Sequence, residues 1–325
     1  MDFQNKKILI TGGAGFIGSA LARRLVAADA DVTVVDSLIP EYGGNLHNLH
    51  GLDGKLQLNI SDVRDAHSMK YLVQDKDLVF NLAGQTSHID SMIDPLTDLE
   101  INTRAQLSIL EALRHHNPAA KIVFASTRQI YGKPDYLPVD EKHPKRPVDV
   151  NGINKIAGED YHRLYSEVYG TRACALRLTN TYGPGMRIKD ARQTFVGIWV
   201  RLLLEGKSFE IWGGDQLRDF NYVEDVVDAF LMAAADPQSD GSVFNLGSDE
   251  VVSLKELGEL LIAVHGGGAF NVCAFPDERK KIDIGDYYSD FWKIRSTLGW
   301  NPKVPLREGL GKTLAYFHEH GSFYL

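Results

Sequence analysis

Short apolar runs recur along the chain, and their spacing predicts a series of buried strands. Each run is a few residues long, is rich in Val, Ile and Leu, and ends at small or polar residues. The runs lie at Lys7 to Thr11, Val32 to Asp36, Leu56 to Ile60, Leu78 to Ala83, Ile122 to Ser126, Ala173 to Leu178, and Val243 to Leu246. Longer stretches between them have apolar residues at the spacing of an amphipathic helix. These stretches are Ser19 to Ala28, Ala105 to His115, Ile153 to Tyr169, Val223 to Ala235, and Leu254 to Val264.

Strands that alternate with helices predict an α/β fold built on a doubly wound parallel sheet, with its ligand crevice at the carboxyl ends of the strands. After Asn180 the pattern loosens into Gly183-Pro184-Gly185 and a charged stretch, which we expect to begin a smaller substrate-covering region. The run at 243–246 returns the chain to the sheet, so the two regions interleave. We expect a sheet domain of residues 1–180 plus about 222–247, and a C-terminal substrate domain of residues 181–221 plus 248–325.

A glycine-rich segment, TGGAGFIG at residues 11–18, directly follows the first predicted strand. Gly12, Gly15 and Gly18 have no side chain, which suits a tight turn, a close approach of the backbone to a pyrophosphate, and close packing of the helix against the strand. The following helix would offer the free amides of its N-terminus to the phosphates. Asp36 ends the next strand, where a carboxylate accepts hydrogen bonds from ribose and repels a 2′-phosphate. The pattern predicts a Rossmann site that prefers NAD to NADP.

Composition narrows the class of protein further. The chain has 325 residues, 44% of them hydrophobic, and a formal net charge of -8. It contains no basic stripe of the kind that binds nucleic acid, and no apolar run as long as the roughly 18 residues that a membrane span needs. Cys174 and Cys273 lack metal-ligand spacing, so we expect ordinary thiols, no metal site and a reducing, cytoplasmic location.

Several further motifs resemble the extended short-chain dehydrogenase/reductase family, the nucleotide-sugar epimerases and dehydratases. They are DVRD at 62–65, NLAGQ at 81–85, Asp98 with Asn102, Ser126-Thr127 with Tyr131-Gly132, RLTNTYGPG at 177–185 and RDFNYV at 218–223. The resemblance covers nearly the whole chain. It implies NAD as cofactor, a nucleotide-diphosphate sugar as substrate, and a homodimer formed by helices after Asn102 and around Lys155.

The resemblance also assigns residues to each ligand. Cofactor contacts are expected at Gly12, Gly15, Phe16, Ile17, Gly18, Asp36, Asp62, Val63, Leu82, Ala83, Gln85, Asn102 and Lys155. The diphosphate and sugar are expected at Arg128, Asn180, Arg187, Gln193, Arg218, Lys280 and Asp283. Arginine, lysine and asparagine side chains suit phosphate oxygens because they donate strong hydrogen bonds to them.

One departure from the family concerns the reacting groups. The resemblance implies hydride transfer from a sugar carbon to NAD⁺ and back, with Thr127 in the catalytic segment and the hydroxyl proton passing to the tyrosine of Tyr-x-x-x-Lys. Here the segment is Asn151-Gly152-Ile153-Asn154-Lys155, and an amide cannot act as that base. Lys155, His88 and Tyr131 are the alternatives as substitute base.

A second departure concerns dehydration. An Asp-Glu pair follows the catalytic threonine in the family's 4,6-dehydratases, whereas Arg128-Gln129 stands here. Ordinary 4,6-dehydration is therefore disfavoured, and Arg128 suits an anionic part of the substrate. The sequence predicts an epimerase-like enzyme that acts by transient oxidation of a sugar carbon. A dehydratase with an unusual base, or a catalytically silent NAD-binding sensor, are the alternatives.

Overall fold

The computed structural model describes residues 1–192, 194–276 and 282–325. The predicted residues Gln193 and Lys280 lie outside these ranges. A parallel sheet in the strand order β10-β6-β5-β4-β1-β2-β3 forms the centre of the molecule. Its strands are β1 (Lys7–Thr11), β2 (Asp31–Asp36), β3 (Gln57–Ile60), β4 (Leu78–Asn81), β5 (Lys121–Thr127), β6 (Arg172–Leu178) and β10 (Val243–Asn245). All seven strand predictions and the doubly wound fold class are confirmed.

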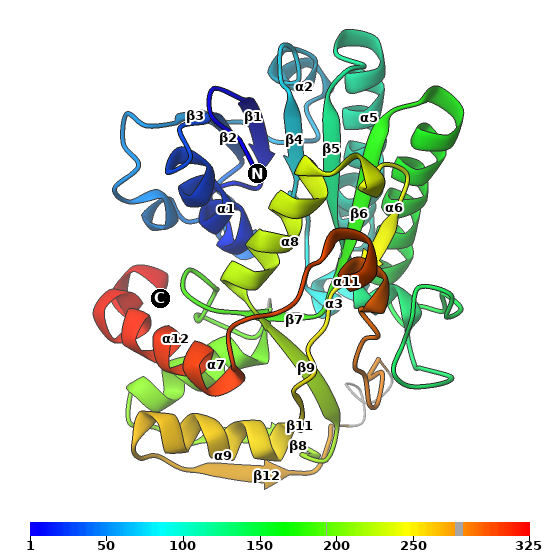
Figure 1. Ribbon diagram of the computed structural model, residues 1–325. Coiled ribbons are helices and arrows are strands. Elements are labelled where there is room, and N and C mark those ends of the chain that lie inside the picture. Colours follow the sequence, from blue (N-terminus) through cyan, green and yellow to red (C-terminus); the bar gives the residue numbers. More distant parts are fainter. Residues whose placement is uncertain (193, 277–281) are drawn as a thin grey trace.

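Helices cover both faces of this sheet. On one face α1 (Phe16–Val26), α8 (Val223–Ala235) and α11 (Trp292–Leu298) pack into a core that includes Ile10, Phe80 and Phe230. On the other face lie α2 (Ala66–Leu72), α5 (Ala105–His116) and α6 (Val150–Tyr169), with a core that includes Leu110 and Leu113. Two short helices, α3 (His88–Ile93) and α4 (Pro95–Leu99), follow β4. Figure 1 shows α8 crossing one face of the sheet in front of β5 and β6.

A smaller group of elements lies beyond the carboxyl ends of the strands (Figure 1). A second core joins α7, α9 and α12 through buried side chains such as Trp199, Phe209 and Phe317. Two small sheets, β11-β9-β7 and β12-β8, belong to this group. Its elements are β7 (Asn180–Tyr182), α7 (Phe195–Leu204), β8 (Phe209–Trp212), β9 (Leu217–Tyr222), β11 (Val251–Ser253), α9 (Leu254–His265), β12 (Phe270–Cys273) and α12 (Leu306–His320).

The return of β10 to the sheet agrees with an interleaved chain, and the exact domain boundaries stay a prediction. Ile294, Leu298 and Trp300 pack in the sheet core although the predicted boundaries assign them to the smaller domain. Within the described residues, no helix is long and apolar enough to cross a bilayer. The cytoplasmic location stays a prediction.

The strand order reverses between β1 and β4, whose neighbours continue in opposite directions. Loops after these two strands therefore diverge to opposite sides and leave a crevice at their carboxyl ends. The glycine segment follows β1, and the segment that leads to His88 follows β4. The fold thus brings the predicted cofactor loop and one predicted base to the same edge of the sheet.

Candidate active site

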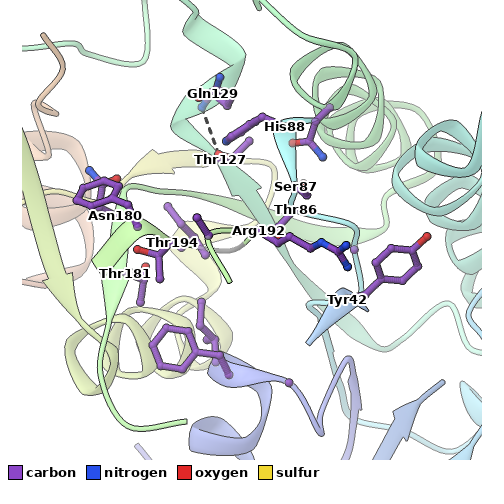
Figure 2. A pocket seen from close by; sticks show the side chains of 18 of the residues that line it. Tyr42, Thr86, Ser87, His88, Thr127, Gln129, Asn180, Thr181, Arg192 and Thr194 are labelled. Carbon is purple, nitrogen blue, oxygen red and sulfur yellow. Dashed lines mark hydrogen bonds between the residues drawn. The ribbon is translucent and has the colours of Figure 1, made fainter. Parts of the chain in front are cut away.

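A single cavity of about 850 Å³ opens at this edge and reaches from the glycine segment to the smaller group of elements. It collects most of the predicted site residues. Those that line it are Gly12, Gly15, Phe16, Ile17, Gly18, Asp36, Asp62, Val63, Leu82, Ala83, His88, Thr127, Arg128, Asn151, Lys155, Asn180, Arg218 and Asp283. Figure 2 shows Thr127, Gln129 and His88 in the upper part of the view, Asn180 to the left and Tyr42 to the right.

Four candidate residues from the sequence do not belong to the cavity wall, and Tyr131 is one of them. Gln85 and Asn102 are buried behind it, where the Asn102 amide donates to the Gln85 carbonyl oxygen at 2.9 Å. Arg187 forms an ion pair of 2.7 Å with Asp190 and also donates to the Pro40 carbonyl. Gln85 and Asn102 therefore lie behind the cavity wall and support it. The Arg187 side chain is held by Asp190 and Pro40.

The glycine segment forms a cradle that only glycine permits. A Cβ atom on Gly18 would collide with the Gly12 carbonyl oxygen, and one on Gly12 would lie 2.9 Å from the Ala83 nitrogen. Gly15 precedes the first turn of α1, where no side chain caps the helix and no acidic residue stands. The free amides of that turn therefore face the cavity, and they suit the oxygens of a pyrophosphate.

Asp36 closes the same end of the cavity. Its two carboxylate oxygens accept from the Leu38 amide at 2.9 Å and the Ala14 amide at 3.0 Å. Burial raises the pKa of this carboxyl, although these backbone hydrogen bonds oppose the rise. The side chain is held rigidly, and each oxygen keeps a lone pair for a ribose hydroxyl. The cradle and Asp36 together fit NAD.

Lys155 stands in the middle of the cavity on α6. Its Nζ atom donates to the Ala125 carbonyl at 3.2 Å and lies 5.0 Å from the centre of the Phe124 ring. Burial lowers the pKa of this lysine to about 8, and the charge of Asp98 only partly opposes the effect. The buried Oδ1 atom of Asn102 has no hydrogen-bond partner, and both it and Nζ approach Gly84. Lys155 therefore presents a charged donor to the cavity, whereas Asn102 lies behind the wall.

Asn151 does not present a reactive group. Its Nδ2 atom donates to the Gln85 carbonyl at 2.8 Å and to Asp98 Oδ2 at 3.0 Å, and its backbone amide donates to Ser91 Oγ. Asn154 binds the other oxygen of Asp98 at 2.7 Å. This amide therefore ties α6 to Gln85, after β4, and to Asp98 of α4.

Arg128, Asn180 and Arg218 form a cationic part of the cavity wall. Arg128 donates to Asn180 Oδ1 at 3.0 Å, and its other terminal nitrogen, Nη1, is buried without a hydrogen-bond partner among residues 1–192, 194–276 and 282–325. Arg218 is buried and lies 3.5 Å from Asp283. Burial, reinforced by repulsion from Arg128, lowers the pKa of Arg218 to about 10. Two arginines so close together, with one donor unsatisfied, form a seat for an anion.

His88 has a partner that sequence reasoning missed. Its Nδ1 atom lies 2.9 Å from Oδ2 of Asp149, whose side chain is fully buried, while the histidine side chain is 40% exposed toward the cavity. Asp149 stands two residues before Asn151 at the start of α6, and its role as a helix cap was readable from the sequence. Its closeness to His88 depends on the packing of α3 against α6 and had no local signal. Tyr42, Gln129 and Arg192 also line the cavity without having been predicted.

The protein has a Rossmann fold, and one cavity collects its glycine segment, Lys155, His88 and two arginines. Comparison with known proteins agrees. The family model described as NAD dependent epimerase/dehydratase family matches residues 8–247. The chain belongs to the NAD-dependent epimerase/dehydratase family, and the predictions of family, enzyme class and NAD are confirmed.

Individual relatives are similar along almost the whole chain. A putative UDP-glucose 4-epimerase of Methanocaldococcus jannaschii is 35% identical over 94% of this chain and 97% of the relative. The UDP-glucose 4-epimerase of Mycolicibacterium smegmatis is 32% identical over 96% and 98%. A solved structure of UDP-glucose 4-epimerase with UDP-glucose from Thermotoga maritima superposes with a TM-score of 0.87, at 31% identity over 96% of this chain and 99% of that one.

Proposed function

We propose that the protein is a nucleotide-sugar epimerase that inverts a sugar carbon through transient oxidation. The names of the relatives point to carbon 4 of the sugar. One observation supports the proposal: the dinucleotide cradle, the pair of arginines, Thr127 and Lys155 all line one cavity. A nucleotide diphosphate held at the arginines would extend its sugar toward Thr127 and Lys155.

The arginine end supports binding of the diphosphate. Arg128 Nη1 is shielded from solvent and has no partner, so a phosphate oxygen would supply the hydrogen bond that the protein leaves open. Asn180 and Arg218 stand beside it, and Asp283 neutralises only part of the charge. Aromatic side chains of the smaller group, Trp212 and Phe275, line the far end of the cavity and suit a nucleobase.

The centre of the cavity supports oxidation of a hydroxyl. Thr127 Oγ1 accepts from the Gln129 amide at 3.2 Å, so its own hydroxyl hydrogen is left to donate to the reacting sugar oxygen. Lys155 is placed to hydrogen-bond the nicotinamide ribose and to place a positive charge near the developing alkoxide. When bound, NAD⁺ accepts a hydride from the sugar carbon and later returns it.

The side chains after Thr127 weigh against dehydration. The Arg128 side chain donates to Asn180, and the side-chain amide of Gln129 donates to Asp149 at 2.9 Å. Neither group can remove a proton from carbon 5 or donate one to a departing hydroxyl at carbon 6 in the manner of an acidic pair. Epimerisation needs neither of these steps.

A ligand screen tests the proposed function. Protein loaded with NAD is heated with UDP-, dTDP-, GDP- and CDP-sugars, and the compound that raises the melting temperature most is incubated with the enzyme and followed by proton NMR. We expect a UDP- or dTDP-sugar to stabilise the protein and to yield its epimer at one carbon. Stabilisation without any new sugar signal would support the silent sensor instead.

We also propose a homodimer, which extends the expectation from the sequence. Leu110 and Leu113 are buried inside the chain and leave no contact surface. On α6, however, Ile153, Leu164 and Val168 are exposed at helical spacing and form an apolar stripe. Light scattering at micromolar concentration should give twice the chain mass, and Leu164→Asp should give the monomer. A monomeric wild-type protein would refute the proposal.

A further inference from the structure

We propose that His88 and Asp149 are the acid–base pair that replaces the absent tyrosine, an inference that rests on the proposed function. His88 begins α3 and lines the cavity, and its Nδ1 atom lies 2.9 Å from Oδ2 of Asp149. Nδ1 is buried and close to this carboxylate, but its N–H is not aligned for a hydrogen bond in this structure. Catalytic hydrogen bonds often tighten when substrate binds, and a ring that turns Nδ1–H toward Asp149 keeps a free lone pair on Nε2. Nε2 is then the atom that takes the proton of the sugar hydroxyl.

Hydrogen bonds tie this pair to Thr127. The Gln129 backbone amide donates to Thr127 Oγ1 at 3.2 Å, and its side-chain amide donates to Asp149 Oδ2 at 2.9 Å. One residue therefore holds both the hydroxyl that polarises the sugar oxygen and the carboxylate that orients the histidine. Figure 2 shows Thr127, Gln129 and His88 in the same upper part of the view. A sugar oxygen that accepts from Thr127 would therefore lie on the side of the cavity where His88 stands.

Asp149 is fixed for the orienting role. Its Oδ1 atom accepts from the Gly152 amide at 2.7 Å and caps α6, which leaves Oδ2 for Gln129 and His88. Burial alone would raise the pKa of this carboxyl, but the His88 hydrogen bond and the other donors outweigh it and hold the pKa low. The carboxylate therefore stays ionised and stabilises the imidazolium that forms, as in hydrolase triads.

Asn151 explains why the tyrosine is missing. Its amide joins Gln85, in the segment that leads to His88, to α6, which carries Asp149. Asn151 is thus a positioning residue that keeps the two halves of the pair together. The Asn151 amide donates to both the Gln85 carbonyl and Asp98. A tyrosine in its place could not donate to both, because a phenol has one O–H group.

The other two sequence alternatives fit the role less well. Tyr131 is fully buried, does not line the cavity, donates to Asn245 at 2.6 Å and accepts from Arg177. Lys155 donates to the Ala125 carbonyl, and with a pKa of about 8 it is mostly protonated at pH 7. Only His88 combines exposure to the cavity with a dedicated orienting carboxylate.

The chemical step balances with this assignment. The O–H bond of the sugar hydroxyl breaks and its proton joins Nε2, while the hydride of the same carbon leaves to NAD⁺ and a C=O bond forms. On the return, the ketone carbon regains the hydride on its opposite face and its oxygen regains the proton from the imidazolium. Neither a proton nor an electron pair is lost to solvent.

The first test removes the base and keeps the shape. His88→Gln can still donate to Asp149 but cannot accept a proton. We expect kcat to fall by about a hundredfold to ten-thousandfold, the usual range for loss of a general base, while the Kd values of NAD and UDP stay within about threefold. His67→Gln, an exposed change on α2, is the matched control and should keep full activity. Retention of at least a tenth of wild-type kcat in His88→Gln would overturn the proposal.

The second test does not depend on turnover. Because Gly152 holds Oδ1, Asp149→Asn should turn its new NH₂ group toward His88 and Gln129. The Gln129 side-chain amide can turn over to accept from this group, and His88 can accept from it only with its proton on Nε2. ¹⁵N NMR of the histidine rings in the NAD complex, assigned by the signal lost in His88→Gln, should show the Nδ1–H tautomer in wild type and the Nε2–H tautomer in Asp149→Asn. The same tautomer in both proteins would contradict the pair.

The outcomes separate this inference from the proposed function. If wild type epimerises a nucleotide sugar and His88→Gln does so equally well, the function stands and the histidine assignment fails. If wild type leaves every nucleotide sugar unchanged, the proposed function fails and the assignment falls with it.

Discussion

Two arginines, buried Arg177 and half-buried Arg128, differ in how their charge is neutralised. Arg177, on strand β6 of the central sheet, donates to both oxygens of Glu159 at 2.9 and 2.6 Å and also donates to Tyr131. Arg128, in the cavity, has Asn180 as its partner, keeps a shielded nitrogen unpaired, and lies near a second cation, Arg218. The charge of Arg177 is neutralised by Glu159 within the protein, and the charge of Arg128 is left for a bound anion to neutralise.

The pKa directions express the same contrast. Burial alone would lower the pKa of Arg177, but its bonds to Glu159 outweigh burial and raise it. Burial lowers the pKa of Arg128, and nearby carboxylates do not restore it. A fully paired buried charge contributes to folding, whereas an incompletely paired one costs stability and is retained for binding. The following predictions test this distinction.

The largest effect is expected where the paired charge is broken. Glu159→Gln leaves Arg177 buried without a counter-ion, which should lower the free energy of unfolding by about 3–5 kcal/mol. Urea unfolding followed by circular dichroism measures the change. Glu167→Gln, which removes an exposed partner of Arg163, is the control and should leave the midpoint unchanged. Equal midpoints for the two variants would show that the Arg177 pair is dispensable.

Lys155 provides the next test, because it is a buried cation without a carboxylate partner. Its pKa is about 8 when folded and 10.5 as the ordinary value, so the buried ammonium disfavours the native state below about pH 8. The penalty is absent above pH 10.5, grows as pH falls from 10.5 to 8, and is complete below pH 8, where it amounts to about 3 kcal/mol. Lys155→Met should therefore be more stable than wild type at pH 7 and should abolish turnover.

The advantage of Lys155→Met should shrink as pH rises from 8 toward 10.5, because the wild-type lysine becomes neutral in both states. Urea midpoints for both proteins at pH 7, 8 and 9.5 measure the trend. A difference in urea midpoint between the two proteins that stays constant with pH would show that Lys155 titrates as an ordinary exposed lysine.

The sequence predicted the parts of the site that depend on local backbone. The glycine cradle and Asp36 lie within two consecutive strand-to-loop connections, so spacing alone places them. The anion seat followed from the resemblance, but the unpaired nitrogen of Arg128 depends on how β5, β7 and β9 meet. The pairing of His88 with Asp149 joins segments far apart in the chain, and no short-range pattern encodes it.

Arg128→Met tests the incompletely paired charge. Loss of a charged hydrogen bond of about 2 kcal/mol should weaken binding of UDP by roughly thirtyfold, while the unfolding midpoint stays the same or rises. Calorimetric titration with UDP measures the affinity. Arg172→Met, which removes an exposed arginine paired with Asp240, should bind UDP as wild type does. An unchanged affinity for UDP in Arg128→Met would contradict the assignment of Arg128 to anion binding.

The smallest effect is expected at the acidic end of the cavity. Asp36 is held by two backbone amides beside the cradle, where a 2′-phosphate would meet its charge. Wild type should bind NAD at least about tenfold more tightly than NADP, a difference of about 1.4 kcal/mol, and Asp36→Ala should narrow it. Calorimetry with both dinucleotides measures the ratio, and an equal preference in wild type would contradict the role of Asp36.

The central claim is that the protein oxidises a sugar carbon transiently and returns the same hydrogen to it. The nucleotide sugar that the screen identifies is prepared with deuterium on the inverted carbon and converted in ordinary water with a catalytic amount of NAD, and the product is analysed by mass spectrometry and NMR. The account predicts an epimer that keeps its deuterium on that carbon. An epimer whose deuterium has exchanged with solvent, or a sugar that remains unconverted, would contradict it.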